Sequence, residues 1–150
     1  MTPLWLKVVH VASLAALFAV IGMPWSSGRG VAAQRSTADA VYTEEQASRG
    51  QALFGRKCQE CHGDGLEGGS MAPGLRGSAF LAPWQGKPLR RLYSRIISTM
   101  PPDDAGSLTE SETLDLVALV LRANGSPAGS QPLARADELD SMVIAAPGGK

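Results

Sequence analysis

The chain has 150 residues, of which 44 % are hydrophobic, and its 14 basic and 14 acidic side chains leave no formal net charge at pH 7. This length fits one domain once a targeting segment is removed. The balanced charge argues against nucleic acid as a partner, because binding to phosphates depends on an excess of clustered Lys and Arg.

Residues 1–33 are typical of an export signal, with a weakly basic start, an apolar core from Val11 to Met23 and a small, polar end. Cleavage after Ala33 makes Gln34 the first mature residue. The apolar core is shorter than the about 20 residues that span a bilayer, so cleavage is favoured over a retained anchor. We therefore expect a periplasmic protein. The alternative is attachment to the periplasmic side of the inner membrane, the only case that involves a membrane.

The next segment, residues 34–42, is small and polar and is predicted to be a linker. A helix is then predicted from Thr43 to about Lys57 or Cys61, because "TEEQ" has the pattern of a capping box with acidic residues in the first turn. Its apolar stripe follows three- and four-residue spacing and contains Gly50, Leu53, Phe54 and Cys58.

The stretch "KCQECHGDG" holds both cysteines of the chain and the one histidine that follows residue 33. On a helix Cys58, Cys61 and His62 face one side. Two thiols at this spacing can add to the two vinyl groups of a haem, and the imidazole then reaches the iron. Cys-x-x-Cys-His is the attachment signature of haem c.

Three other interpretations of this cluster are weaker. A structural zinc site needs four Cys or His ligands, and this segment offers three. A redox dithiol of the thioredoxin type needs a strand–helix–strand context, whereas the surroundings here are helical and rich in glycine. A disulfide between the two cysteines would close a trivial loop and stabilise little.

Residues 63–79 are predicted to be a loop, because glycines and Pro73 interrupt them. A short amphipathic helix follows over 87–99, and the prolines of "MPPDDAGS" end it. The inward face of this helix is expected to contain Leu89, Leu92, Tyr93, Ile96 and Ile97.

The sixth iron ligand is predicted to be Met100, because it lies at a rigid break far enough along the chain to reach the second haem face. Met71 follows the haem helix too closely, and Met142 lies in the tail. Both remain alternatives, as does an open iron site.

The last clear helix starts at a second capping box, Thr109 with Glu112, and ends at "NG". Its apolar face contains Leu116, Leu119 and Val120. Residues 126–150 form a tail that is either extended or docked as a short helix over about 134–143. No sheet is predicted, and the fold class is all-α.

Residues 43–125 resemble a small monohaem c-type cytochrome of the bacterial class I. Gly50, Phe54 and Cys58 match the family's first helix, and Leu116 and Leu119 match the last helix that crosses it. The resemblance implies a cytochrome c fold, with about four short helices around one haem c that is attached through Cys58 and Cys61. A looser likeness is to bacterial cytochromes that accompany quinoprotein dehydrogenases.

The segment "APGLRG" resembles the family's Pro-x-Leu-x-Gly loop. The resemblance implies that the Pro73 carbonyl accepts a hydrogen bond from His62, that Leu75 packs on the haem, and that the Trp84 indole meets a haem propionate. The alternatives are an ordinary loop proline and a partly buried aromatic. The chain lacks the lysine ring of the mitochondrial form, which argues against mitochondrial-type partners.

We therefore predict a carrier of single electrons between redox proteins, and not an enzyme: a dehydrogenase as donor, an oxidase or another cytochrome as acceptor. It would act as a monomer or as a subunit of a redox complex, with docking near Lys57. The alternative function is a haem-based ligand sensor or a peroxidase-like enzyme, which would need an open or labile sixth position on the iron.

Overall fold

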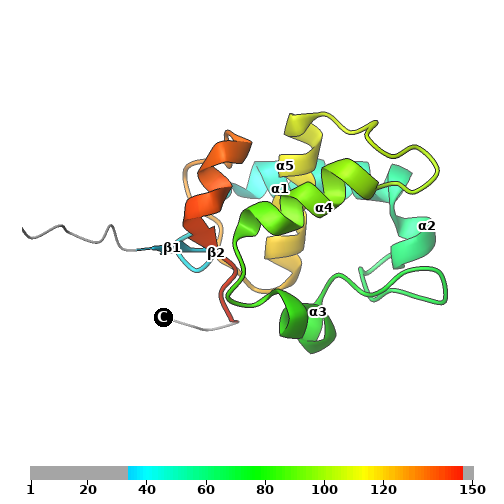
Figure 1. Ribbon diagram of the computed structural model, residues 1–150, viewed down its shortest axis with the longest axis horizontal. Coiled ribbons are helices and arrows are strands. Elements are labelled where there is room, and N and C mark those ends of the chain that lie inside the picture. The colour runs from blue at the N-terminus through cyan, green and yellow to red at the C-terminus, as the bar shows by residue number, and fades with distance from the viewer. Residues whose placement is uncertain (1–33, 147–150) are drawn as a thin grey trace, which may run out of the picture. The chain divides into compact units, whose positions relative to one another are not determined.

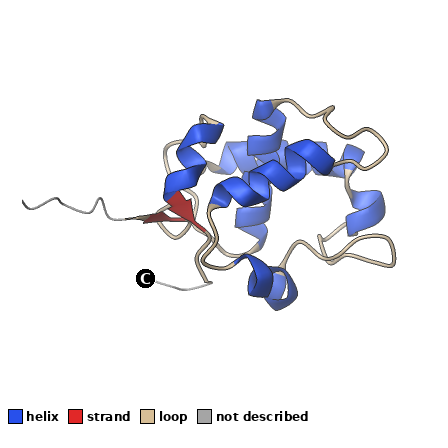
Figure 2. Ribbon diagram, in the orientation of Figure 1, coloured by secondary structure: helices blue, strands red, loops and turns tan. Residues whose placement is uncertain are grey.

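The computed structural model describes residues 34–146, and the predicted signal segment 1–33 lies outside them. The all-α class is confirmed (Figures 1 and 2). No helix in the described part of the chain is long and apolar enough to span a bilayer. The elements in chain order are β1 (Arg35–Ser36), α1 (Glu44–Lys57), α2 (Gln59–His62), α3 (Gly77–Trp84), α4 (Leu89–Thr99), α5 (Glu110–Ala123), the 3-10 helix η1 (Ala136–Ser141) and β2 (Met142–Val143).

The contact between α1 and α5 is the central packing of the fold (Figure 1). It is a backbone contact, because a methyl group on Gly50 would lie 2.0 Å from the Asp115 carbonyl oxygen. An ion pair flanks it on one side, where Arg49 donates to both carboxylate oxygens of Asp115 at 2.8 and 2.9 Å. Near the other end Arg122 pairs with Glu44 at 2.7 Å. The crossing of the first helix by the last, which the family resemblance implies, is present.

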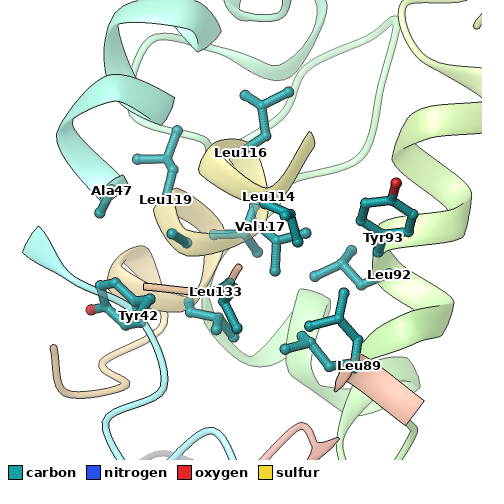
Figure 3. Packing of buried hydrophobic residues seen from close by; sticks show 14 of the residues in the cluster. Tyr42, Ala47, Leu89, Leu92, Tyr93, Leu114, Leu116, Val117, Leu119 and Leu133 are labelled. Carbon is teal, nitrogen blue, oxygen red and sulfur yellow. The ribbon is translucent and has the colours of Figure 1, made fainter. Parts of the chain in front are cut away.

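The hydrophobic core forms around α5, from which nine residues are buried. Figure 3 shows Leu114, Leu116, Val117 and Leu119 of this helix between side chains of α1 on one side and of α4 on the other. Three of the five predicted inward residues of α4 are buried, namely Leu89, Leu92 and Tyr93, while Ile96 and Ile97 are half-buried against the core. The amphipathic patterns thus predict the core-facing sides of both helices.

Two helices differ from the prediction. The first predicted helix is divided at Cys58, whose φ of −130° departs from helical geometry and leaves α1 and the single turn α2 on either side. The second difference is α3, whose first three residues, 77–79, lie in the segment predicted to be a loop. It has Gly77 at its first position and Pro83 near its end. Eight residues with such ends give too little periodicity to reveal a helix.

The predicted linker 34–42 is part of the folded domain. Its strand β1 pairs in parallel with β2, so that Arg35 lies opposite Met142. Thr37 is fully buried and accepts a hydrogen bond from the amide of Ala145. The Tyr42 hydroxyl donates to the Ser126 carbonyl at 2.7 Å. The polar composition of this segment concealed these contacts, because they depend on residues about a hundred positions away.

The partners in these contacts, Ser126, Met142 and Ala145, belong to the tail. The tail also packs on the domain through η1, in which Leu139 is fully buried. The buried side chain of Gln46 holds the middle of the tail, since its amide donates to the Leu133 carbonyl and its carbonyl accepts from the Leu133 amide, both at 2.9 Å. The predicted first capping box is therefore only half correct. Thr43 caps the helix, but Gln46 satisfies two buried backbone groups of the tail instead of returning to Thr43. The second box, at Thr109 and Glu112, is complete.

The contact at Gly50 predicts a large loss of stability when it is replaced. Gly50→Ala should lower the free energy of unfolding by about 3 kcal/mol or more, because the added methyl group forces α1 away from the backbone of α5. Gly55→Ala in the same helix is the matched control, since the added methyl would meet only the end of the Gln59 side chain at 3.4 Å. It should be neutral or stabilise by up to about 1 kcal/mol. Urea unfolding measures both, and equal losses would contradict the crossing described here.

Candidate haem site

A cavity of about 870 Å³ opens between the cysteine segment, the loop after it, α3 and the end of α4. All seven residues proposed from the sequence as site residues line it: Cys58, Cys61, His62, Pro73, Leu75, Trp84 and Met100. Its inner wall is apolar and comes from Phe54 of α1 and from Leu116, Leu119 and Val120 of α5. The cavity is of the size that cofactor sites occupy, which run from about 300 to 1,000 Å³.

Cys58 and Cys61 lie on one side of this cavity and form no disulfide with each other. The turn that joins them is held by the Cys58 carbonyl, which accepts from the amides of Cys61 at 3.2 Å and of His62 at 3.0 Å. Burial raises the pKa of the Cys58 thiol to about 11, and the positive charge of Lys57 offsets part of this rise. The turn from Cys58 to His62 thus carries both cysteines and the imidazole on the cavity wall.

The orientation of His62 is fixed by a hydrogen bond to the loop. Its Nδ1 lies 2.8 Å from the carbonyl oxygen of Pro73. A carbonyl can only accept, so Nδ1 carries the proton, and in the corresponding neutral tautomer the free electron pair is on Nε2. The ring is buried and lines the cavity. The bond that the family resemblance implies is thus present, and it leaves Nε2 available as a metal ligand.

The loop that carries Pro73 is itself tied down. The Gly68 amide donates to the His62 carbonyl at 2.7 Å, and the Leu75 amide donates to the Leu66 carbonyl at 2.8 Å. Gly68 has a φ of +83°, and a methyl group there would lie 2.3 Å from the Gly74 nitrogen, so only glycine fits. These contacts keep the two halves of the loop close to each other, with the Pro73 carbonyl beside the imidazole.

Asn124 is a site-supporting residue that sequence reasoning missed, because "NG" was interpreted only as a stop signal. Its side-chain nitrogen donates to the Leu75 carbonyl at 2.9 Å, and its side-chain oxygen accepts from the Gly77 amide at 2.9 Å. One side chain at the end of α5 therefore holds both the end of the loop and the start of α3. A lone polar residue beside a helix end gives no sequence signal for such a distant contact.

The structure separates the three candidate methionines. Met100 ends α4, where its amide donates to the Ile96 carbonyl at 3.0 Å, and it lines the cavity with His62. Met71 also lines the cavity, but it is 65 % exposed and lies in the loop two residues before Pro73. Met142 is buried in β2 and is not part of the cavity wall. Met100 therefore stays the favoured prediction for the second iron ligand.

The outer side of the cavity is formed by α3 and α4. Trp84 is half-buried, and its ring stacks on Phe80 with 5.9 Å between the ring centroids. Arg95, which is not among the residues predicted for the inward face of α4, also lines the cavity. It is the one arginine on the wall. Among residues 34–146, no three His, Cys, Asp or Glu side chains gather as a site for a metal ion, so the zinc interpretation gains no support.

Comparison with known proteins agrees with this geometry. The family model for subunit III of cbb3-type cytochrome c oxidase matches residues 45–120, which is more than half of the chain. A solved structure, the sulfane dehydrogenase SoxCD from Paracoccus pantotrophus, is similar with a TM-score of 0.50 at 24 % identity. That similarity covers 70 % of this chain and 60 % of that chain, and it shows the fold alone. No curated protein matches significantly.

The residues of the cavity fit a covalently attached haem c: two thiols at the attachment spacing, an imidazole with Nε2 free, and an apolar hollow of suitable size. The two cysteines should each contribute one bond. Cys58→Ala and Cys61→Ala should retain haem through a single thioether, and the double variant should lose all haem in acidified organic solvent. The alkaline pyridine spectrum of the reduced protein measures this, because its main band shifts with each thioether. A single variant with an unshifted band would contradict the assignment.

Proposed function

Because this chain belongs to the family of cbb3-type cytochrome c oxidase subunit III and carries a covalent haem c, we propose that it is a periplasmic electron carrier with His62 and Met100 as axial ligands. The observation that carries the proposal is the 2.8 Å contact between Nδ1 of His62 and the Pro73 carbonyl, which leaves Nε2 as the available ligand atom of a ring that lines the cavity. When bound, the haem iron supplies the reversible exchange of one electron.

The residues around the iron adjust its reduction potential and exclude other ligands from it. The Pro73 carbonyl increases the electron density on the imidazole of His62, while a thioether such as that of Met100 favours the reduced iron and raises the reduction potential. The apolar wall from α1 and α5 keeps water away and acts in the same direction. If His62 and Met100 both hold the iron, a small ligand or substrate would have no place on it.

The donor in this proposal is a dehydrogenase, with a quinoprotein as one candidate, and the acceptor is an oxidase or another cytochrome. The family name favours an oxidase as acceptor. The chain could serve it as a diffusing carrier or as a bound subunit. The packing of the tail favours the diffusing carrier. Its apolar residues Leu133, Leu139 and Ile144 are buried in its own domain and so are not free to bind another protein.

Met100→Ala tests the axial ligation against the alternative of an open iron. In the unaltered protein the oxidised spectrum should show the iron–sulfur charge-transfer band, and carbon monoxide should leave the reduced spectrum unchanged. Met100→Ala should lose the band, bind carbon monoxide and have a lower reduction potential.

The matched control is Met71→Ala, which removes the other methionine of the cavity wall and should leave band, carbon monoxide response and potential unchanged. If the unaltered protein binds carbon monoxide readily, the carrier proposal fails and the sensor or peroxidase-like enzyme takes its place. If Met71→Ala and not Met100→Ala removes the band, the ligand assignment is wrong while the carrier function stands.

A further inference from the structure

A second hollow, of about 620 Å³, lies beside the haem cavity between the end of α3 and the first turns of α4. We call it the basic groove. Four cations line it, Lys87, Arg90, Arg91 and Arg95, together with Trp84 and Pro83. Asp140 of η1 is the single carboxylate on its wall. The groove therefore has a strongly positive character in a chain without formal net charge.

The groove is continuous with the haem cavity. Pro83, Trp84 and Arg95 line both hollows. A molecule seated in the groove would thus lie against the same side chains that close the cavity on this side. Efficient electron exchange needs a partner close to the haem, and this is a position that provides the proximity.

The cations of the groove are available to a partner. Within the described part of the chain, none of the four forms an ion pair. Arg91 and Arg95 are exposed, and both follow Lys87 at intervals of four residues, which places them along one side of α4. Arg90 lies over the ring of the buried Tyr93, 5.4 Å from its centroid, and this contact holds its charge beside that ring.

These cations are not explained by helix stability. Arg56 and Lys57 are a second exposed basic pair, of which Lys57 lines the haem cavity, and they lie in the last turn of α1, where positive charge offsets the helix dipole. Arg56 also donates to the Ala52 carbonyl of its own helix at 2.9 Å. The groove cations start at the opposite end of their helix, where positive charge is unfavourable. Their position favours an intermolecular role.

We propose that the basic groove is the docking surface for an acidic patch on a redox partner protein, an inference that rests on the proposed carrier function and differs from the docking near Lys57 expected from the sequence. A concave site with a recessed, half-buried Trp84 suits protruding carboxylates better than a flat lipid surface. Attraction by these charges would raise the rate of encounter and orient the partner toward the haem.

The test uses the reduced holoprotein and a polyglutamate peptide as the acidic probe. Amide NMR shifts should concentrate on residues 84–95 and should vanish as salt rises from about 20 to 200 mM. Lys87→Glu with Arg91→Glu should weaken binding at least tenfold, roughly as expected for reversed rim charges. The matched control is Arg35→Glu with Arg76→Glu, which changes the charge equally on exposed residues outside both hollows and should weaken binding less than about threefold.

Three results would overturn the inference: shifts centred on residues 56–64, equal weakening by both charge variants, or binding to phosphatidylglycerol vesicles that exceeds binding to the peptide. The carrier function is read separately. Stoichiometric oxidation by ferricyanide and reduction by dithionite should each transfer one electron per protein in all variants, because these reagents need no docking surface. Loss of that cycle in the unaltered protein defeats the carrier proposal. An intact cycle, together with peptide-induced shifts that do not concentrate on residues 84–95, defeats only the proposal that the groove is the docking surface.

Discussion

The close approach of α1 and α5 at Gly50 is the constraint on which the rest of the structure depends. Because the Gly50 backbone touches the Asp115 carbonyl, the two helix axes are as near as their backbones allow. This contact fixes where Phe54 from α1 and Leu116 from α5 stand, and both belong to the apolar wall of the haem cavity. A wider crossing would open that wall to water before it disturbed any residue that binds the haem.

The remaining walls are also attached to α5. α4 packs on it and ends at Met100, and Asn124 at its C-terminal end holds both Leu75 and the start of α3. The side of the cavity that carries His62 is thus connected to the same helix as the side that carries Met100. A haem held between these two sides would need such a frame, because the two axial ligands proposed for it, His62 and Met100, come from segments 38 positions apart in the sequence.

The sequence predicted those parts of the molecule whose signal is local. The cysteine–histidine cluster, the amphipathic faces of α4 and α5 and the complete cap at Thr109 each depend on residues within a few positions of one another. The features that were missed depend on distant partners: Gln46 with Leu133, Asn124 with Leu75 and Gly77, and the strand pair β1 and β2. A polar residue that satisfies a distant backbone group looks the same in sequence as one that faces water.

The burial of the tail bears on how the protein meets its partners. Residues 126–146, which include η1 and β2, cover the side of the domain that carries β1. Backbone groups of this segment make the contacts with Tyr42, Gln46 and Lys87, and such groups need a hydrogen-bond partner once they leave water. That side is already occupied by the protein itself. Charge attraction in salt solution acts over about 8 Å, so only cations near the site of contact can guide a partner. The basic groove adjoins the haem cavity and shares Pro83, Trp84 and Arg95 with its wall. Its cations can therefore act at the place where an electron must cross.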